Sequence, residues 1–374
     1  MKLYRYIWNE WIKVFLITGC LVVGLIVIQE VYSRLNGWIE KGATWGEIIF
    51  LFLLKVPLFL PSIIPIVLLL SVLFSIGVMH RKNEIVAMRA AGISLWKISQ
   101  PLMFAAFVLA GTILYLDASF VPWSVETQSD LETKIHERRV NAESAEVATK
   151  QEKKEIVRNL GYLNFHEQRL WLMGNYDPFL RRGEEVTVYQ MDEKGREVYR
   201  IRAAHASYDA ELGSWSFEKG RELFFDGESE EPYRNRGFET LLKPDVNEDP
   251  QIMIYLRKKP QDLSLFELRR VIDAYEGFET PAIVPYEVRY FRNLLSPLIC
   301  FLVVGFGVPF AASGVRTNPM IGISKAVGLF VLYFIVSNIS TIMGDAGVVE
   351  PFIAAGIPLI FIGAVAVRVF VKAQ

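Results

Sequence analysis

The sequence predicts an α-helical membrane protein with six transmembrane helices, three on each side of an inserted all-β domain. Six long apolar segments lie three at each end of the chain, and a polar block of roughly residues 122–291 separates them. Hydrophobic residues make up 52% of the 374 residues, which exceeds an average soluble protein but not a membrane-embedded bundle. Such a chain joins a lipid bilayer to an aqueous compartment.

The expected spans follow from length, because about 20 mostly apolar residues are needed to cross the hydrocarbon core of a bilayer. They are Ile12–Tyr32, Ile48–Met79, Ile98–Phe120, Leu294–Ala312, Ile323–Met343 and Pro351–Phe370. The first is expected to be retained rather than cleaved, since no small-x-small signal-peptidase site follows it. In the second, Pro57, Pro61 and Pro65 recur every four residues and predict a packed kink.

Lysine and arginine in the short loops predict the orientation, because cytoplasmic loops are enriched in these residues. The residues expected on the cytoplasmic side are Lys2, Arg5, Lys13, Arg81, Lys82, Arg89, Lys97, Arg316, Lys325, Arg368 and Lys372. The first loop on the opposite side carries only Arg34 and Lys41. We therefore expect both termini in the cytoplasm and the polar block outside, which is the periplasm of a Gram-negative cell.

The amino-acid composition of the polar block changes along its length. Val125–Lys154 is charged and predicts a helix that continues the third span, and Asp262–Glu276 predicts a second helix capped by Ser264. Between them lie short aromatic and β-branched runs, at Tyr162–Leu172, Val186–Met191, Val198–Tyr208, Ser214–Phe225, Phe238–Leu242 and Ile252–Leu256. Turn residues separate these runs, which favours a β-sandwich, barrel or jelly roll. The expected domains are residues 1–124, 125–261 and 262–374.

Residues that carry enzyme chemistry are scarce. Cys20 and Cys300 both lie inside apolar segments, and no metal-type Cys/His spacing, phosphate-binding loop or dinucleotide motif is present. Ser94 and Lys97 match the spacing of some acyl enzymes, but the companion motifs are missing. We therefore expect a non-catalytic chain without cofactor or metal, whose energy for transport comes from an ion gradient or a partner.

The segment between the second and third spans is the sharpest local pattern. Asn83 can cap a short helix, Glu84 suits its first turn, and Gly92 suits its end. Ile85 and Met88 fall on one face. The pattern fits either a helix docked in a partner's groove or one that lies on lipid headgroups.

The segment Glu84–Gly92 resembles the Glu-x-x-x-Met-x-Ala-x-Gly signature of the LptF/LptG permease family of lipopolysaccharide export. The resemblance covers nearly the whole chain. Further matching motifs, in order, are Arg5-Tyr6-Ile7, Val56-Pro57, Pro65, Leu263–Leu268, Pro297-Leu298 and Val315–Met320. The Arg316–Met320 stretch is more similar to LptG than to LptF.

The resemblance implies a permease subunit of an ATP-driven ABC transporter in the inner membrane. It implies as partners a second permease of the LptF/LptG pair, an LptB-type ATPase dimer, LptC-type and LptA-type periplasmic proteins, and lipopolysaccharide. The residues that would couple the chain to the ATPase are Glu84, Ile85, Met88 and Arg89. The external domain is expected to resemble a β-jelly roll that passes the lipid toward the outer membrane.

Basic residues also gather near the outer ends of the spans, against the cytoplasmic bias. They are Arg34, Lys41, Lys55, Arg289 and Arg292. Charges in or near a membrane often mark a ligand path, and lipid phosphates suit basic side chains. The alternative is snorkelling with local pairing to Glu30, Glu40, Glu47 and Glu287. The family places basic residues late in span one, where this chain has Glu30, Ser33 and Asn36.

The family uses spans one and five as a lateral gate. The candidates here are Gly24, Ile28 and Val31 in the first span, and Leu329 and Tyr333 in the fifth. In the β domain, Leu163, Phe165, Val186, Val188, Ile201 and Phe217 would line either an acyl-chain groove or a closed core. The rival functions are a secondary transporter, an exporter of another amphiphilic lipid, and a structural or signalling membrane protein.

Overall fold

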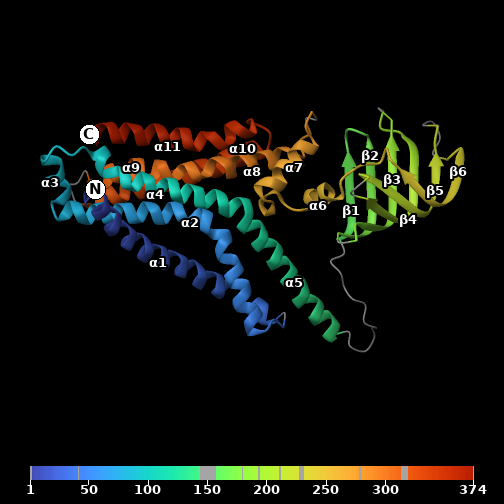
Figure 1. Ribbon diagram of the computed structural model, residues 1–374, viewed down its shortest axis with the longest axis horizontal. Helices are drawn as coiled ribbons and strands as arrows, with labels where there is room; N and C mark the ends of the chain where they lie inside the picture. The colour runs from blue at the N-terminus through green and yellow to red at the C-terminus, as the bar shows by residue number, and fades with distance from the viewer. Residues whose placement is uncertain are drawn as a thin grey trace. The chain divides into compact units, whose positions relative to one another are not determined.

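The computed structural model describes residues 2–40, 42–143, 157–178, 180–192, 194–209, 212–226, 231–277, 280–312 and 319–373. Its internal contacts divide the chain into two units. The helical unit comprises residues 1–147, 264–268 and 284–374, and the β unit comprises residues 148–263 and 269–283. Figure 1 shows the elements of both units.

The helical unit contains the long helices of the chain and the short helix α3. They are α1 (Lys2–Glu40), α2 (Trp45–Arg81), α3 (Glu84–Ala90), α4 (Leu95–Tyr115), α5 (Val121–Glu143), α8 (Val284–Leu295), α9 (Ile299–Ala312), α10 (Pro319–Asp345) and α11 (Pro351–Ala373). A π-helical turn, Leu116–Phe120, joins α4 to α5, and a 3-10 turn, Ser296–Leu298, joins α8 to α9.

Six stretches within the described residues are long and apolar enough to cross a membrane. They are Lys2–Glu40, Trp45–Arg81, Leu95–Glu132, Val284–Ala312, Ile321–Asp345 and Pro351–Lys372. Each expected span falls inside one of these stretches. The prediction of a helical membrane protein with six spans is therefore confirmed.

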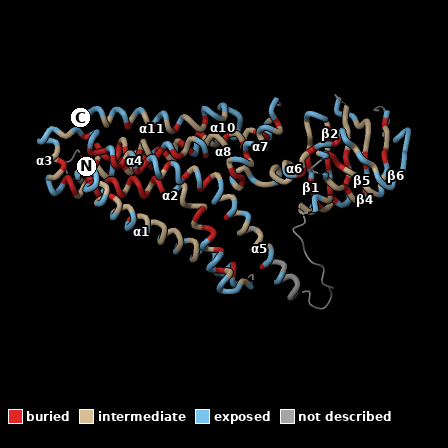
Figure 2. Tube along the Cα trace, viewed as in Figure 1, coloured by how far each residue is buried: buried red, intermediate tan, exposed pale blue. Residues whose placement is uncertain are grey.

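Helix α2 lies at the centre of the helical unit and packs against α1, α4, α5 and α9. Its buried positions include Leu68, Val72 and Ile76, which recur every four residues along one face. Figure 2 shows the buried residues concentrated along α2, α4 and α9. Gly307 on α9 allows close approach, because a Cβ there would lie 3.4 Å from Val72 Cγ1.

The three prolines of α2 lie inside one continuous helix. Each lacks a backbone N–H, so each removes one hydrogen bond of the helical ladder. Figure 1 shows α2 bent part-way along its length, as the proline spacing predicts. Pro57 and Pro65 are buried, which agrees with a packed kink.

The start of α1, helix α3, the start of α4 and the end of α11 lie at one end of the helical unit (Figure 1). The Tyr4 hydroxyl donates a 2.8 Å hydrogen bond to Oε1 of Gln100 on α4. The rings of Trp96 and Phe370 meet edge to face, with centroids 6.0 Å apart. Both ends of the chain are thus placed beside α3, as alternating spans require.

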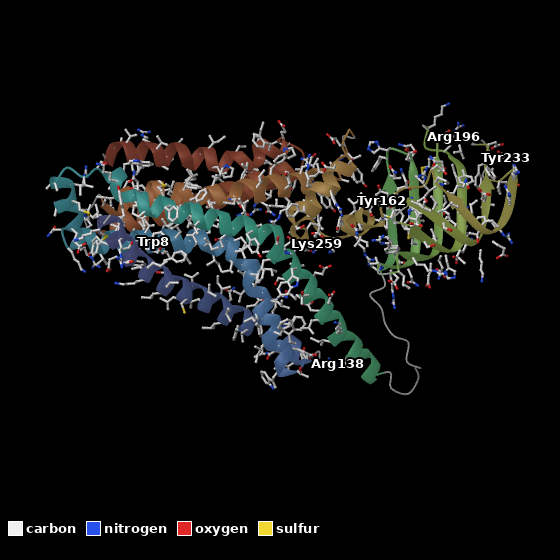
Figure 3. The ribbon with its side chains drawn as sticks, in the orientation of Figure 1. Trp8, Arg138, Tyr162, Arg196, Tyr233 and Lys259 are labelled. Carbon is white, nitrogen blue, oxygen red and sulfur yellow. The ribbon has the colours of Figure 1, made fainter. Side chains whose placement is uncertain are left out.

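Helix α5 packs along α2 at the other end of this unit. Arg138 on α5 (labelled in Figure 3) donates to both carboxylate oxygens of Glu47, at 2.7 and 3.2 Å. Glu47 also accepts from the backbone N–H of Thr44 and so caps the start of α2. The expected helix Val125–Lys154 is confirmed up to Glu143, and the rest lies outside the described residues.

The β unit contains one described six-stranded sheet, in which every neighbouring pair is antiparallel. Its strands, in spatial order, are β1 (Val157–Asn164), β2 (Arg169–Asp177), β3 (Arg182–Met191), β4 (Glu197–Asp209), β5 (Ser214–Phe224) and β6 (Arg234–Lys243). The all-β prediction is confirmed. The consecutive order makes the described strands a meander, which differs from the Greek-key order of a jelly roll.

Aromatic rings show that this sheet is strongly curled. Trp171 on β2 and Trp215 on β5 have ring centroids 4.8 Å apart. Three strand spacings of about 4.8 Å each would separate β2 from β5 in a flat sheet, or roughly 14 Å. Phe217 stacks on Trp171, with centroids 6.0 Å apart, and all three rings are fully buried. The concave face of the sheet therefore closes on its own core.

Two strand assignments from the sequence needed correction. The run Ile252–Leu256 is helical, inside α6 (Pro250–Arg257), because the Asp249 carboxylate accepts from the backbone N–H of Gln251 and Pro250 opens the helix. The run Tyr162–Leu172 is a hairpin that contains the end of β1 and the start of β2.

The helix expected at Asp262–Glu276 is α7 (Leu265–Ala274), which follows a 3-10 turn, Pro260–Asp262. The Ser264 hydroxyl accepts a 3.1 Å hydrogen bond from the backbone N–H of Glu267. The Glu267 carboxylate accepts a 2.7 Å bond from the backbone N–H of Ser264. This reciprocal capping box confirms Ser264 as the cap.

Candidate functional site

Helix α3 occupies the place where the sequence predicts a partner-binding segment. Asn83, just before it, adopts a left-handed conformation with φ 62°, and its side chain makes no capping hydrogen bond. The expected side-chain cap is therefore wrong. At the other end Gly92 has φ 79°, and the N–H groups of Gly92 and Ile93 donate to carbonyl oxygens in the last turn. This Schellman motif confirms Gly92 as the helix stop.

The four residues predicted for coupling divide between the core and the surface. Ile85 is 1% exposed, and Met88 packs against the same core. Arg89 is exposed and Glu84 is half-buried. The Glu84 carboxylate accepts a 2.9 Å hydrogen bond from the hydroxyl of Tyr6 on α1. The apolar pair therefore attaches α3 to its own chain, and the polar pair remains at the surface.

Ser94 has a structural role at the start of α4. Its hydroxyl accepts a 3.4 Å hydrogen bond from the backbone N–H of Lys97. Ser94 is thus the N-cap of α4.

Arg34 and Lys55, two of the predicted headgroup residues, meet at one carboxylate. The Lys55 ammonium contacts Oε1 of Glu30, and Nε of Arg34 lies 2.8 Å from the same oxygen. The Lys55 side chain is 7% exposed, whereas the Arg34 side chain is 57% exposed. This cluster links α1 to α2, as the local-pairing alternative predicted. Lys41 lies outside the described residues.

The other two headgroup candidates, Arg289 and Arg292, line a cavity of about 120 Å³ within the helical unit. Its wall comes from α2, the π-helical turn, α8, α10 and α11. Asp117 contributes a carboxyl group to the same cavity. The remaining polar lining residues are Ser62, Asn293, Ser296, Tyr333, Ser337 and Thr341.

The π-helical turn Leu116–Phe120 carries Asp117 into this cavity. Such turns are rare and occur frequently at functional sites. Asp117 is 8% exposed, and a buried charge needs an opposite charge or a hydrogen-bond partner. The guanidinium groups of Arg289 and Arg292 supply opposite charge in the same cavity. Chemically, the cavity suits either an anionic group at the arginines or a proton at Asp117.

The gate candidates lie on two helices that do not form a packed pair within the chain. On α1, Ile28 is 67% exposed, Val31 is half-buried, and a Cβ added at Gly24 would meet no atom within 4 Å. On α10, Leu329 packs against the helical core and Tyr333 lines the cavity. Helix α1 packs on α2 and α4, whereas α10 packs mainly on α8, α9 and α11.

The inward-facing candidates of the β unit are mostly buried by the protein itself. Val186, Val188, Ile201 and Phe217 are each at most 3% exposed. Leu163 and Phe165 are half-buried. In this structure the inner face of the sheet is a packed core, and it holds no open groove along these four side chains.

Among the tyrosines of the β unit, Tyr162, Tyr176 and Tyr199 have strongly raised pKa values. Burial raises the pKa of Tyr162 and of Tyr176. Burial and a hydrogen bond donated to Glu222 raise the pKa of Tyr199. These hydroxyls remain protonated near neutral pH, so no tyrosinate charge enters the core. Among the described residues of both units, no three His, Cys, Asp or Glu side chains are grouped to hold a metal ion.

Two features of the site were not found from the sequence. The contact between Tyr6 and Glu84 joins residues 78 positions apart, and no local pattern signals it. The cavity shared by Asp117, Arg289 and Arg292 also depends on the packing of distant helices. The signal that was available is Asp117 itself, since an acidic residue inside an apolar span points to a function.

A comparison with protein families decides which class of membrane protein this is. The model described as lipopolysaccharide export system permease LptF/LptG matches residues 5–372. This chain belongs to the LptF/LptG permease family. No curated protein matched the chain.

Membership of the LptF/LptG family makes the chain a multi-pass inner-membrane permease of a lipopolysaccharide export system, and a non-catalytic subunit of it. The family model covers LptF and LptG together. The closer similarity to LptG therefore stays a prediction, and Arg316–Asn318, which carry part of it, lie outside the described residues.

Proposed function

We propose that this LptF/LptG-family permease is the membrane subunit of an ATP-driven exporter that extracts lipopolysaccharide from the inner membrane. The observation that carries the proposal is the family match over residues 5–372. The arrangement of a six-span helical unit with an inserted β unit supports it. The partners proposed are a second LptF/LptG permease, an LptB-type ATPase dimer, and LptC-type and LptA-type proteins.

Helix α3 is the proposed docking element for the ATPase. It lies at the end of the helical unit that also holds both chain ends (Figure 1). Ile85 and Met88 fix α3 to the core, so a push on α3 is transmitted to the membrane helices. Glu84 and Arg89 supply the charged groups that a partner contacts.

The lipid is proposed to enter between two permeases. The exposed middle of α1 and the face of α10 do not pair within one chain, so a gate made from both requires the second permease. Arg34, Lys55, Arg289 and Arg292 are the proposed headgroup contacts. They form two clusters, one at Glu30 and one at the Asp117 cavity.

The β unit is the proposed route from the membrane toward LptC-type and LptA-type proteins, on the periplasmic side. Its inner face is closed by Trp171, Trp215 and Phe217. Acyl chains can therefore reach that face only when the sheet uncurls.

The test is co-purification followed by an ATPase and lipid-release assay. Wild-type chain, co-expressed with its genomic neighbours, should recover a soluble ATPase and a second six-span protein. Glu84→Ala should lower recovery of the ATPase or the lipid released per ATP by about tenfold, since loss of a charge-assisted contact costs roughly 1.5–3 kcal/mol. The matched control is Glu10→Ala, which removes a carboxylate paired with Lys13 on the surface of α1.

Two results would overturn the proposal. One is recovery of no ATPase with the wild-type chain. The other is full association and lipid release by the Glu84→Ala variant, which would remove the coupling role from α3.

A secondary transporter is the second candidate, and the buried carboxyl of Asp117 in a polar cavity favours it. Ion-coupled transporters carry such groups near their binding sites. Proteoliposomes separate the two candidates, because lipid release driven by an imposed proton or sodium gradient without ATP would establish the ion-coupled function. Replacing lipopolysaccharide with other amphiphilic lipids in the same assay tests the third possibility, a different lipid cargo.

A further inference from the structure

The carboxylate of Glu30 contacts two cationic side chains at once. The Lys55 ammonium from α2 and Nε of Arg34 from α1 both contact its Oε1 atom. The Glu30 side chain is 16% exposed and the Lys55 side chain 7%, so this pair is largely removed from solvent. A carboxylate with two charge-assisted contacts presents the same chemistry that a phosphate oxygen would present to these cations.

Glu30 neutralises a buried positive charge in the lipid-free protein. A buried ammonium without an anion is strongly destabilising, because the lost hydration is not replaced. Without Glu30, the buried Lys55 ammonium would have no anion whenever no lipid phosphate was bound. Glu30 supplies the missing negative charge from within the chain.

The same contact ties the middle of α1 to α2 through charge. Among the described residues of α1, none between Thr18 and Trp38 is buried. Leu21, Leu25 and Ile28 in this stretch are each more than 60% exposed. Separating the middle of α1 from α2 therefore breaks the Glu30 contact without uncovering a fully buried side chain of this stretch.

We propose that Glu30 is an internal counter-ion that holds Lys55 and Arg34 until a lipid phosphate displaces it, and that this exchange releases the middle of α1 from α2. The inference rests on the proposed function, in which α1 is a gate helix. It assigns to Glu30 the task of linking arrival of the lipid headgroup to movement of that helix.

The exchange is favourable on charge and geometry. A phosphate monoester carries more than one negative charge near neutral pH and offers three acceptor oxygens. It can bind the ammonium and the guanidinium on separate oxygens, whereas Glu30 places both on one. Glu30 lies about one helical turn from Arg34, at the outer end of the expected first span, where the released carboxylate regains water.

The test uses the full chain with Glu30→Gln, which keeps the size of the side chain and removes its charge. Spin labels at Ile28→Cys on α1 and Leu53→Cys on α2 report the helix separation, in a Cys20→Ser background because Cys20 is exposed. The protein is placed in nanodiscs of zwitterionic phosphatidylethanolamine. Lipopolysaccharide and phosphatidylglycerol are then added in separate arms.

Wild-type protein should show one short distance without added lipid and a longer distance with lipopolysaccharide. Glu30→Gln should show the longer distance without any anionic lipid. Its apparent dissociation constant for lipopolysaccharide should fall about tenfold, if Glu30 holds the cations about nine-tenths of the time in the wild type. Glu10→Gln, which removes a surface carboxylate elsewhere on α1, should behave as wild type.

A second variant keeps the test valid if Glu30→Gln misfolds because Lys55 is left buried without an anion. Glu30→Gln/Lys55→Gln leaves no buried charge in this cluster, and it should show the longer distance and no response to lipopolysaccharide. A wild-type response to phosphatidylglycerol as large as the response to lipopolysaccharide would support the exchange and assign it to any lipid phosphate.

The inference is overturned if the short distance and the wild-type lipid affinity persist in both Glu30 variants. That failure is separate from failure of the proposed function. ATP-driven lipopolysaccharide release by the wild-type complex tests the proposed function, and it does not depend on how α1 is held.

Discussion

The buried ion pair between Arg169 and Glu248 joins the start of β2 to the segment before α6. Nη1 of Arg169 lies 2.7 Å from Oε1 of Glu248, and the side chains are 6% and 2% exposed. Asn164 donates a 3.0 Å hydrogen bond to the same oxygen, and Nε of Arg169 donates to Gln190. The polar groups at this end of the sheet are thus organised around one carboxylate.

Glu248→Ala should destabilise the β unit by about 3–5 kcal/mol, because Arg169 would remain buried without its anion. Native-state hydrogen exchange of the β2 amides in the full-length chain measures this loss. Glu197→Ala is the control, since its pair with Arg200 is partly exposed and should contribute less than about 1 kcal/mol. Equal exchange rates in the two variants would contradict the prediction.

At the scale of single residues, the sequence predicted which residues have a structural role better than it predicted which residues contact each other. Ser264 was found as a cap because a capping box spans only three positions. Asn83 was predicted as a cap from its residue type alone, but its backbone is left-handed and its side chain makes no capping hydrogen bond. The choice of Glu30 as partner for Lys55 depends on how α1 and α2 pack, which no local pattern encodes.

Among elements, the link between α1 and α3 has the clearest functional consequence. Ile7 and Trp11 on α1 are buried in the same core as Ile85 on α3. One polar contact, from Tyr6 to Glu84, joins the two helices at the surface. We therefore expect movement of α3 to reach the start of α1 through this core and this contact.

Tyr6→Phe should weaken ATPase association up to about fivefold, because an exposed hydrogen bond to a carboxylate contributes about 1 kcal/mol and orients Glu84. Binding of the ATPase to the purified variant is the measurement. Tyr4→Phe is the matched control, since its hydroxyl contacts Gln100 and leaves Glu84 untouched. In a Glu84→Ala background Tyr6→Phe should add nothing, and an additive loss would show that Tyr6 acts elsewhere.

The elements themselves were largely predictable, because membrane spans and amphipathic strands leave strong periodic patterns. The exceptions are α6 and the run Tyr162–Leu172, which is a hairpin of β1 and β2. The run Ile252–Leu256 of α6 is short and apolar enough for a strand, but Asp249-Pro250 is the N-cap and first-turn signature of a helix. The curl of the sheet was not predictable, since the contact between Trp171 and Trp215 joins strands that are not neighbours.

At the scale of the whole molecule, the division into two units allows the functional contribution of each unit to be tested separately. Residues 157–257 can be replaced by a flexible Gly/Ser linker without removing any residue of the helical unit. The shortened chain should insert in the membrane and retain the ATPase, because α3 and its supporting core are intact. It should fail to pass lipopolysaccharide to a periplasmic acceptor.

Co-purification and a lipid-transfer assay on the same preparation check both expectations. The control is the full-length Glu84→Ala variant, which keeps the β unit and should lose the ATPase. Transfer of lipid by the shortened chain would exclude the β unit from the route.

The order of the spans and of the inserted domain was predictable from the sequence, and the set of residues that share the cavity was not. The order of spans, the inserted block and the motif at Glu84–Gly92 are all local, so one pass along the chain finds them. Asp117, Arg289 and Arg292 come from opposite sides of the inserted block. Only the packed helices show that they share a cavity.

The π-helical turn at Leu116–Phe120 has a consequence for how this chain tolerates change in length. A π turn holds one more residue than the α turn it replaces, so it corresponds to a single-residue insertion in the α4–α5 rod. Each residue rotates an α-helix by about 100°. Because the wide turn absorbs its extra residue, deleting one residue there would leave an α turn and keep Ser124 facing the carbonyl of Leu54 and Arg138 facing Glu47. A deletion elsewhere in the rod would rotate both contacts away, so this turn is the place where loss of one residue is best tolerated.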